Sequence, residues 1–193
     1  MNEIIDVMVK RRSIRHYLAK QISNDDLNCI LTAGLYAANG GNLQHPRFIA
    51  VQDPEILSNL VKTVREELMI QEIKEGQYKN KSIKAAQASE DYNFLFHAPT
   101  LIIVISDRSW GNSMADSASC LQNMQLAAYS LELGACWVNQ LHWLTDTPSI
   151  RKIVEGLGMS PEEDIYGSMA VGCPANPLPS PPARKEGRII IHR

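Results

Sequence analysis

Residues 10–17 read Lys-Arg-Arg-Ser-Ile-Arg-His-Tyr, which places Arg11, Arg12 and Arg15 and the Ser13 hydroxyl within five residues. A guanidinium group presents a planar set of donors that fits phosphate oxygens, and it keeps its charge at neutral pH. The serine adds a small donor that can approach a phosphate or a sugar hydroxyl closely. From these residues alone two interpretations stay open. One is a solvated basic turn, the commoner use of such a run, and the other is a phosphate-binding site.

Helical patterns flank this stretch on both sides. Apolar residues between Ile4 and Val9 recur at helical spacing and predict a short first helix that ends in the arginine cluster. Ser23 is a good N-cap for a second helix, whose apolar face continues to Asn39. Residues 39–46, Asn-Gly-Gly-Asn-Leu-Gln-His-Pro, then stop that helix.

The segment 39–46 also has two interpretations. The amides of Asn42 and Gln44 carry donors and acceptors that suit the edge of a heteroaromatic ring. The adjacent glycines would let the backbone come close to a ligand or to a neighbouring chain. Considered alone, however, such a segment is more commonly just a helix-ending turn.

The remaining pattern alternates helices with short strands. Residues 101–105 are apolar on successive positions, which predicts a strand covered on both faces and central in its sheet. Residues 116–133 form the most apolar helical pattern and predict a helix buried on most sides. Residues 71–93 are polar and weakly periodic, and two interpretations stay open for them, a helix and a mobile covering segment. Further elements are expected as strands at 48–51 and 168–172, a strand or extended loop at 136–140, and helices at 53–68 and 149–155, with a turn at 159–163.

The C-terminal end has a pattern of its own. Five prolines in residues 173–182 exclude a helix or a central strand and predict an extended arm. Residues 188–192, Arg-Ile-Ile-Ile-His, then read as a β-branched strand. A strand at the end of a stiff arm favours pairing with the sheet of another subunit.

Composition limits the class of protein. A length of 193 residues fits a single domain, 1–193, and a net charge of −2 argues against a nucleic-acid binder. The longest apolar run, 101–105, is far below the ~20 residues of a membrane span. The amphipathic start at Glu3 shows no secretory signal, so we expect a cytoplasmic protein.

The four cysteines, Cys29, Cys120, Cys136 and Cys173, show no metal-ligand spacing. No zinc site can be built from them, and we expect no metal. They read as reduced thiols, with Cys29 and Cys120 as small core residues of helices. The absence of a G-x-G-x-x-G or P-loop sequence argues against a Rossmann or nucleoside-triphosphate site. The order of elements indicates an α+β chain.

Four segments in order resemble the nitroreductase-like family of FMN-dependent oxidoreductases. The resemblance extends from about residue 4 to 191, with 71–93 poorly matched. Each motif is weak alone, whereas four in the right order are specific. The matching segments are Arg11–Arg15 (R-R-S-x-R), Asn42–Gln44 (N-x-Q), Asp116–Trp137 (a core helix followed by L-G-x-x-x-W) and Val171–Ala175 (V-G-x-P-x).

This resemblance implies a three-layer fold in which helices flank a central, mainly antiparallel sheet. It further implies an intertwined homodimer with exchange of the C-terminal strand and two FMN sites at the subunit interface. Carried over by position, Arg11, Ser13 and Arg15 would hold the FMN phosphate and ribityl chain. Arg12 would assist, and Arg184 would reach the same phosphate from the proline arm.

The flavin ring would take its contacts from two further segments. Asn42 and Gln44 would bind the flavin from the other subunit. Val138, Asn139 and Gln140 would lie along the isoalloxazine ring and offer backbone donors. The loop departs from the family pattern P-S-x-x-N-x-Q-P, because alanine and asparagine stand at the proline and serine places.

The function implied is an NAD(P)H oxidoreductase. Hydride would pass from NADH or NADPH to FMN and then to a nitro compound, a quinone or a similar flat acceptor. No side chain need act as an acid or base, so no catalytic residue is assigned. The alternative is a protein that stores, senses or consumes FMN without an external acceptor. Lys81 and Lys84 are candidates for a flavin contact by their place in the sequence only.

Overall fold

The protein is described here by a computed structural model of residues 2–193. Its centre is a four-stranded sheet in the order β1-β2-β4-β3, in which every neighbouring pair is antiparallel. The predicted buried strand lies within β2, between β1 and β4, and is fully covered. The expectation of a central strand is therefore confirmed. The strands are β1 (Arg47–Val51), β2 (Thr100–Asp107), β3 (Gly134–Val138) and β4 (Glu163–Gly172).

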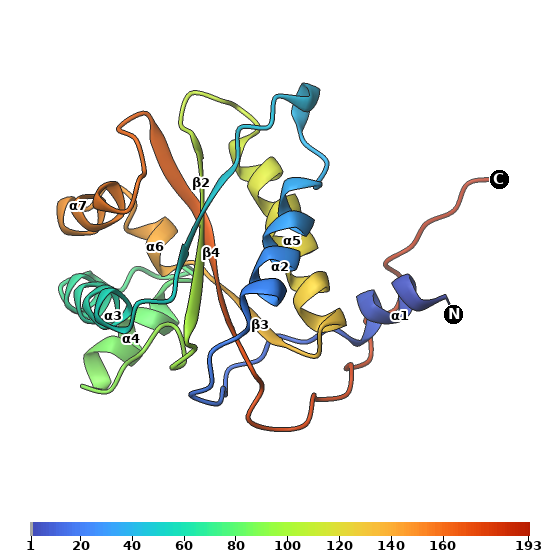
Figure 1. The fold of residues 1–193 in the computed structure, drawn as a ribbon, viewed down its shortest axis with the longest axis horizontal. Coiled ribbons are helices and arrows are strands. Elements are labelled where there is room, and N and C mark those ends of the chain that lie inside the picture. Colours follow the sequence, from blue (N-terminus) through green and yellow to red (C-terminus); the bar gives the residue numbers. More distant parts are fainter. Residues whose placement is uncertain (1) are drawn as a thin grey trace.

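Helices cover both faces of this sheet and make three layers (Figure 1). One face carries α2 (Asn24–Leu35) and α5 (Ser113–Ser130), with α1 (Glu3–Lys10) beyond α5. The other face carries α3 (Pro54–Met69), α4 (Asn80–Ala88), α6 (Gln140–Trp143) and α7 (Pro148–Gly156). The predicted three-layer α+β fold with a mainly antiparallel sheet is confirmed.

The successive apolar residues of β2 supply two hydrophobic cores. Leu101, Ile103 and Ile105 pack with α3, α4 and α7 on one side. Ile102 and Val104 pack with α2 and α5 on the other. Neighbouring side chains of a strand point to opposite faces, so a strand between two helical layers must be apolar at every position.

Helix starts follow their capping residues. The Asp53 side chain accepts hydrogen bonds from the N–H groups of Glu55 and Ile56 at 2.8 and 3.1 Å, and Pro54 takes the first helical position. The Ser23 hydroxyl accepts from the Asp26 N–H at 3.0 Å. Both predicted caps are confirmed.

Several expectations about individual segments were wrong. The second helix ends at Leu35, with a short 3-10 turn at Gly40–Asn42. The expected turn at 159–163 is present at residues 161–162, but β4 begins at Glu163, earlier than the expected 168, and the Glu163 carboxylate pairs with Arg47 at 2.8 Å. Cys29 is exposed, whereas Cys120 is buried as predicted. The helix α6 was not predicted, and the weakly periodic 71–93 segment contains α4.

The single chain leaves apolar surface open. Met114, in the first turn of α5, is exposed, and α1 buries none of its residues. The expected burial of the 116–133 helix on most sides is confirmed, because only Gln122, Ser130 and Glu132 are exposed in that range. At the other end, Ile189, Ile190 and Ile191 are 82%, 81% and 66% exposed and belong to no strand of this chain.

Residues 2–193 contain no helix long and apolar enough to cross a bilayer. Nor do they contain a group of three or more His, Cys, Asp or Glu side chains arranged to hold a metal ion.

Candidate cofactor-binding site

The arginine segment, residues 11–18, is fixed along the edge of the sheet beside β3. The Ile14 N–H donates to the Ala135 carbonyl at 3.0 Å, and the Leu18 N–H donates to the Cys173 carbonyl at 2.9 Å. A Cβ on Gly134 would lie only 2.8 Å from the Ile14 side chain, so the two backbones are in close contact. The segment is thus a backbone-paired element, which sets where its arginines project.

The positive charge on this segment has no counter-ion in residues 2–193. None of Arg11, Arg12, Arg15 and Arg184 forms an ion pair with a carboxylate. Burial, followed by repulsion from Arg12 and Arg184, lowers the pKa of Arg11 below its usual value. Arg11, Arg12 and Arg184 thus lie close enough to repel one another, and an anion would stabilise this cationic cluster.

The Arg11 side chain is the most confined of the set. Its Nη1 donates to the Gln125 side-chain oxygen of α5 at 3.2 Å. Its Nε is buried and has no hydrogen-bond partner. A buried, unpaired guanidinium donor is costly, and a negatively charged ligand would offset that cost.

The side chains of Arg12 and Arg15 make different contacts. Arg12 turns back to the end of α1, where its Nη2 and Nε donate to the carbonyls of Val9 and Lys10 at 2.5 and 3.2 Å. Arg15 lies over the Phe96 ring, 5.6 Å from its centroid, within the range of a cation–π contact. Phe96 itself has a φ of +55°, an uncommon conformation for a bulky residue. Its backbone is thus held in an unusual state directly beneath Arg15.

Cys136 lies among these arginines but supplies no negative charge. Its side chain is buried, and this burial raises the pKa of the thiol, an effect that the Arg15 charge only partly opposes. The thiol stays neutral at physiological pH and does not neutralise the cluster.

Beside Arg15 lies a cavity of about 140 Å³ that contains the other predicted contact segment of the same chain. Val138, Asn139 and Gln140 line it at the end of β3. Gln140 is fixed by its amide nitrogen, which lies 3.2 Å from the Ser82 hydroxyl and 3.0 Å from the Tyr92 hydroxyl. The structure thus brings Arg15 and the three residues 138–140 to one place.

Sequence reasoning missed most of the opposite wall of this cavity. Tyr78, Ser82, Phe96 and Trp143 line it, and Lys81 is the one member that was a candidate. Tyr78, Lys81 and Ser82 come from the segment 71–93, whose weak periodicity carried no signal for a site. These residues lie close to β3 because α4 packs against one face of the sheet.

The proline arm adds a wall on another side of the arginine segment. Ser13 and Arg15 line a second cavity, of about 350 Å³, together with Asn176, Pro177 and Pro179. The Ala175 N–H donates to the His16 carbonyl at 3.0 Å and holds the start of the arm there. Arg184 follows farther along this arm.

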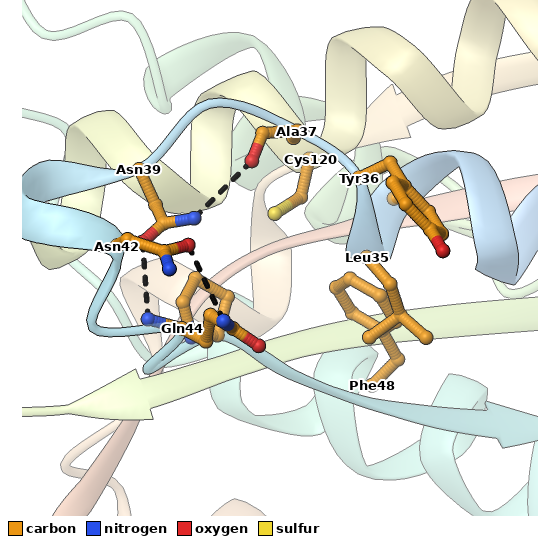
Figure 2. Close-up of a pocket in the computed structure, with 10 residues that line it drawn as sticks. Leu35, Tyr36, Ala37, Asn39, Asn42, Gln44, Phe48 and Cys120 are labelled. Atoms are coloured by element: carbon orange, nitrogen blue, oxygen red, sulfur yellow. Dashed lines mark hydrogen bonds between the residues drawn. The ribbon is translucent and has the colours of Figure 1, made fainter.

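The amide loop, residues 39–46, lies elsewhere in the same chain. Asn42 and Gln44 line a cavity of about 530 Å³ beside α2, shown in Figure 2. The loop is attached to α5 near Asp116, whereas Arg11 contacts Gln125, about 14 Å farther along the helix. Figure 1 shows the loop and the arginine segment at opposite ends of α5. One chain does not bring these two predicted groups together.

The chain is thus a three-layer α+β domain whose arginine cluster at the sheet edge has no carboxylate partner in residues 2–193. The family model described as the nitroreductase family matches residues 8–173, and the chain belongs to that family. A solved relative, the nitroreductase with bound FMN from Bacteroides fragilis, is 34% identical and has a TM-score of 0.91, and the match covers 100% of both chains. The predicted family is confirmed.

Two further relatives are flavin reductases by name. The NADPH-flavin oxidoreductase of Vibrio harveyi is 25% identical over 198 residues, which cover 100% of this chain and 74% of the relative. The FMN reductase (NADPH) of Bacillus subtilis is 25% identical over 186 residues, which cover 91% of this chain and 68% of the relative.

Proposed function

We propose that this protein reduces flat, electron-poor acceptors such as nitro compounds or quinones, with electrons from NADH or NADPH. Membership of the nitroreductase family and kinship with NADPH-dependent flavin reductases make it an FMN-dependent NAD(P)H oxidoreductase. The observation that carries the assignment of the site is the uncompensated arginine cluster beside an aromatic-lined cavity.

The residues of this cluster fit the phosphate end of FMN. A phosphate monoester carries nearly two negative charges and three acceptor oxygens. Arg11, Arg15 and Arg184 offer positive charge without carboxylate partners, and Ser13 adds a hydroxyl. The unpartnered Nε of Arg11 is the particular donor that such a ligand would satisfy.

The cavity next to Arg15 fits the other end of the cofactor. Bound FMN supplies the hydride chemistry, and the chain binds and orients it. Val138, Asn139 and Gln140 line one side and offer main-chain donors, while Phe96 and Trp143 supply apolar surface on the other. No acid or base of the chain is assigned to a step, so these residues act by binding and by limiting access of water.

A second copy of the chain completes this proposed site. Asn42 and Gln44 are exposed and lie away from the arginines of their own chain, so a homodimer is the arrangement that lets them serve a flavin. Leu35 and Tyr36, at the start of the cavity beside α2, are 63% and 85% exposed. Exposed apolar surface of this kind marks an interface.

The direct test uses the purified protein. We expect a flavin absorbance spectrum, and oxidation of NADH or NADPH that accelerates when a nitroarene or a quinone is added. Comparison of the two nicotinamides at equal concentration gives the preferred donor. A flavin-loaded protein that oxidises neither nicotinamide with any acceptor would favour an FMN-storing or FMN-sensing role. A colourless protein that does not bind added FMN would contradict both functions.

Two binding-deficient variants should complement each other in a mixed dimer. One variant carries Arg11→Ala and Arg15→Ala, and the other carries Asn42→Ala and Gln44→Ala. Because each proposed site takes its arginines from one copy and its amides from the other, the mixed dimer contains one intact site. We expect about half the FMN-binding capacity of the wild type after co-expression and tandem purification through two different tags. If both groups served their own chain, the mixed dimer would bind no FMN tightly.

A further inference from the structure

We infer that Asp116 and Trp110 are positioning residues that hold the amide loop in the conformation presenting Asn42 and Gln44 to the cofactor. This inference rests on the proposed function, because it assigns those two amides to FMN. Neither Asp116 nor Trp110 lies among the residues that would touch the cofactor, so their effect would pass through the loop.

Asp116 binds the loop with both carboxylate oxygens engaged. Its Oδ1 accepts a hydrogen bond from the Gly40 N–H at 3.0 Å, and its Oδ2 accepts from the Trp110 indole Nε1 at 2.9 Å. The residue is only 5% exposed and forms no ion pair in residues 2–193. A carboxylate can be buried when hydrogen bonds satisfy its oxygens, and hydrogen bonds to a charged acceptor are stronger than those to a neutral one.

Trp110 holds the same loop by packing. The His45 ring, at the far end of the loop, stacks on the Trp110 ring with centroids 5.4 Å apart and planes inclined by 28°. At the near end, a Cβ on Gly40 would lie 2.7 Å from the Asn112 amide nitrogen and 2.9 Å from the Trp110 ring. A side chain at this position would force the Asn112 amide or the Trp110 ring to shift, so the loop backbone lies directly against this segment.

The loop needs this support because its backbone is strained. The φ angles of Asn42 and Gln44 are +56° and +54°, and the φ angle of Gly41, which precedes Asn42, is +61°. Non-glycine residues persist in this region only where the surroundings hold them, and such strain is found at functional sites. Within the loop, the Asn39 oxygen accepts from the Gln44 N–H at 3.0 Å, and the Asn42 oxygen accepts from the Gln44 amide at 3.2 Å (Figure 2).

The test replaces the carboxylate by its uncharged isostere. In Asp116→Asn the amide can accept from one of the two N–H donors, but its own NH2 then opposes the other. We expect the Kd for FMN to rise about tenfold, measured by quenching of flavin fluorescence on apoprotein. Asp53→Asn is the matched control, because the Asp53 carboxylate also accepts two N–H groups, at 2.8 and 3.1 Å, but at the start of α3, away from the loop. Its Kd should stay within about twofold of the wild type.

Two combinations separate positioning from a general structural effect. Trp110→Phe removes the indole N–H that would face the new NH2 group in the Asp116→Asn variant. The double variant should therefore recover part of the FMN affinity that Asp116→Asn loses. Adding Asp116→Asn to a protein that already carries Asn42→Ala and Gln44→Ala should weaken FMN binding no further. Independent, additive losses in that background would overturn the inference.

The outcomes also distinguish this inference from the proposed function. A wild-type protein that does not bind FMN contradicts the proposed function. If folded Asp116→Asn binds FMN as tightly as the wild type does, only the positioning role is contradicted. If circular dichroism shows that Asp116→Asn is unfolded, Trp110→Phe alone decides, because it removes one bond of the clamp. An unchanged Kd in that variant overturns the inference, and a raised Kd supports it.

Discussion

Replacing both Arg11 and Arg15 with alanine should abolish tight FMN binding and leave the protein folded. Each arginine would make charge-assisted hydrogen bonds to the phosphate, worth about 1.5–3 kcal/mol per bond. This corresponds to about ten- to hundredfold in Kd for one arginine and about 10²–10⁴-fold for the pair. Titration of the apoprotein with FMN, followed by quenching of flavin fluorescence, measures the change.

The folded state should not lose stability by the same change. Because the pKa of Arg11 is lowered by burial and by repulsion from Arg12 and Arg184, its charged form is less favourable in the folded chain than in the unfolded one. That unfavourable contribution exists at every pH below the lowered pKa, including neutral pH. Removing this charge therefore leaves the Tm of the apoprotein unchanged or raises it, apart from the loss of the Arg11–Gln125 bond and of the Arg15 contact with the Phe96 ring.

Matched variants test whether the loss of FMN affinity depends on where the removed positive charge lies. Lys62→Ala removes a positive charge from α3, where the side chain is 74% exposed and does not line the cavity beside Arg15. We expect the FMN affinity of that variant to equal that of the wild type. Arg12→Ala should give a smaller loss than Arg11→Ala, because its guanidinium is bonded to the carbonyls of Val9 and Lys10. Unaltered FMN affinity in the Arg11, Arg15 double variant would refute the phosphate assignment.

The fold was predictable where burial is reflected in residue type. Residues 101–105 could only be a strand between two helical layers, and Asp53-Pro54 could only start a helix. The start of β4 was not predictable in this way. Its first residue, Glu163, is buried because Arg47 of β1 pairs with it, and that contact joins positions 116 residues apart. An acidic residue after a proline reads as a turn unless this partner is known.

The candidate site was predictable in part for a similar reason. The arginines stand close together in the sequence, and their lack of carboxylate neighbours became visible only in three dimensions. The wall formed by Tyr78 and Ser82 has no sequence signal, because polar residues of a short helix look like any solvated face. Asp116 was noted only as the start of a helix, since its bond to Gly40 crosses 76 positions. What is missing from the sequence is the set of long-range contacts.

Removing residues 183–193 should convert a dimer into monomers. Ile189, Ile190 and Ile191 are largely exposed in the single chain, and no backbone hydrogen bond within the chain holds the arm beyond Ala175. Burial of an isoleucine side chain contributes about 1.5–3 kcal/mol, so docking three of them on a partner contributes up to about 4.5–9 kcal/mol per arm. Sedimentation equilibrium of full-length and truncated protein compares their dimer dissociation constants.

The truncation also removes Arg184, so its effect on the dimer must be separated from its effect on the cofactor. Arg184→Ala in the full-length chain keeps the three isoleucines and should lower FMN affinity about tenfold with the dimer constant unchanged. Conversely, replacing the three isoleucines by serine should weaken the dimer while Arg184 remains. A truncated protein whose dimer is as stable as the full-length one would show that the arm does not pair across the interface. The dimer would then depend on the other exposed apolar surface of the chain, that of α1 and of Leu35 and Tyr36.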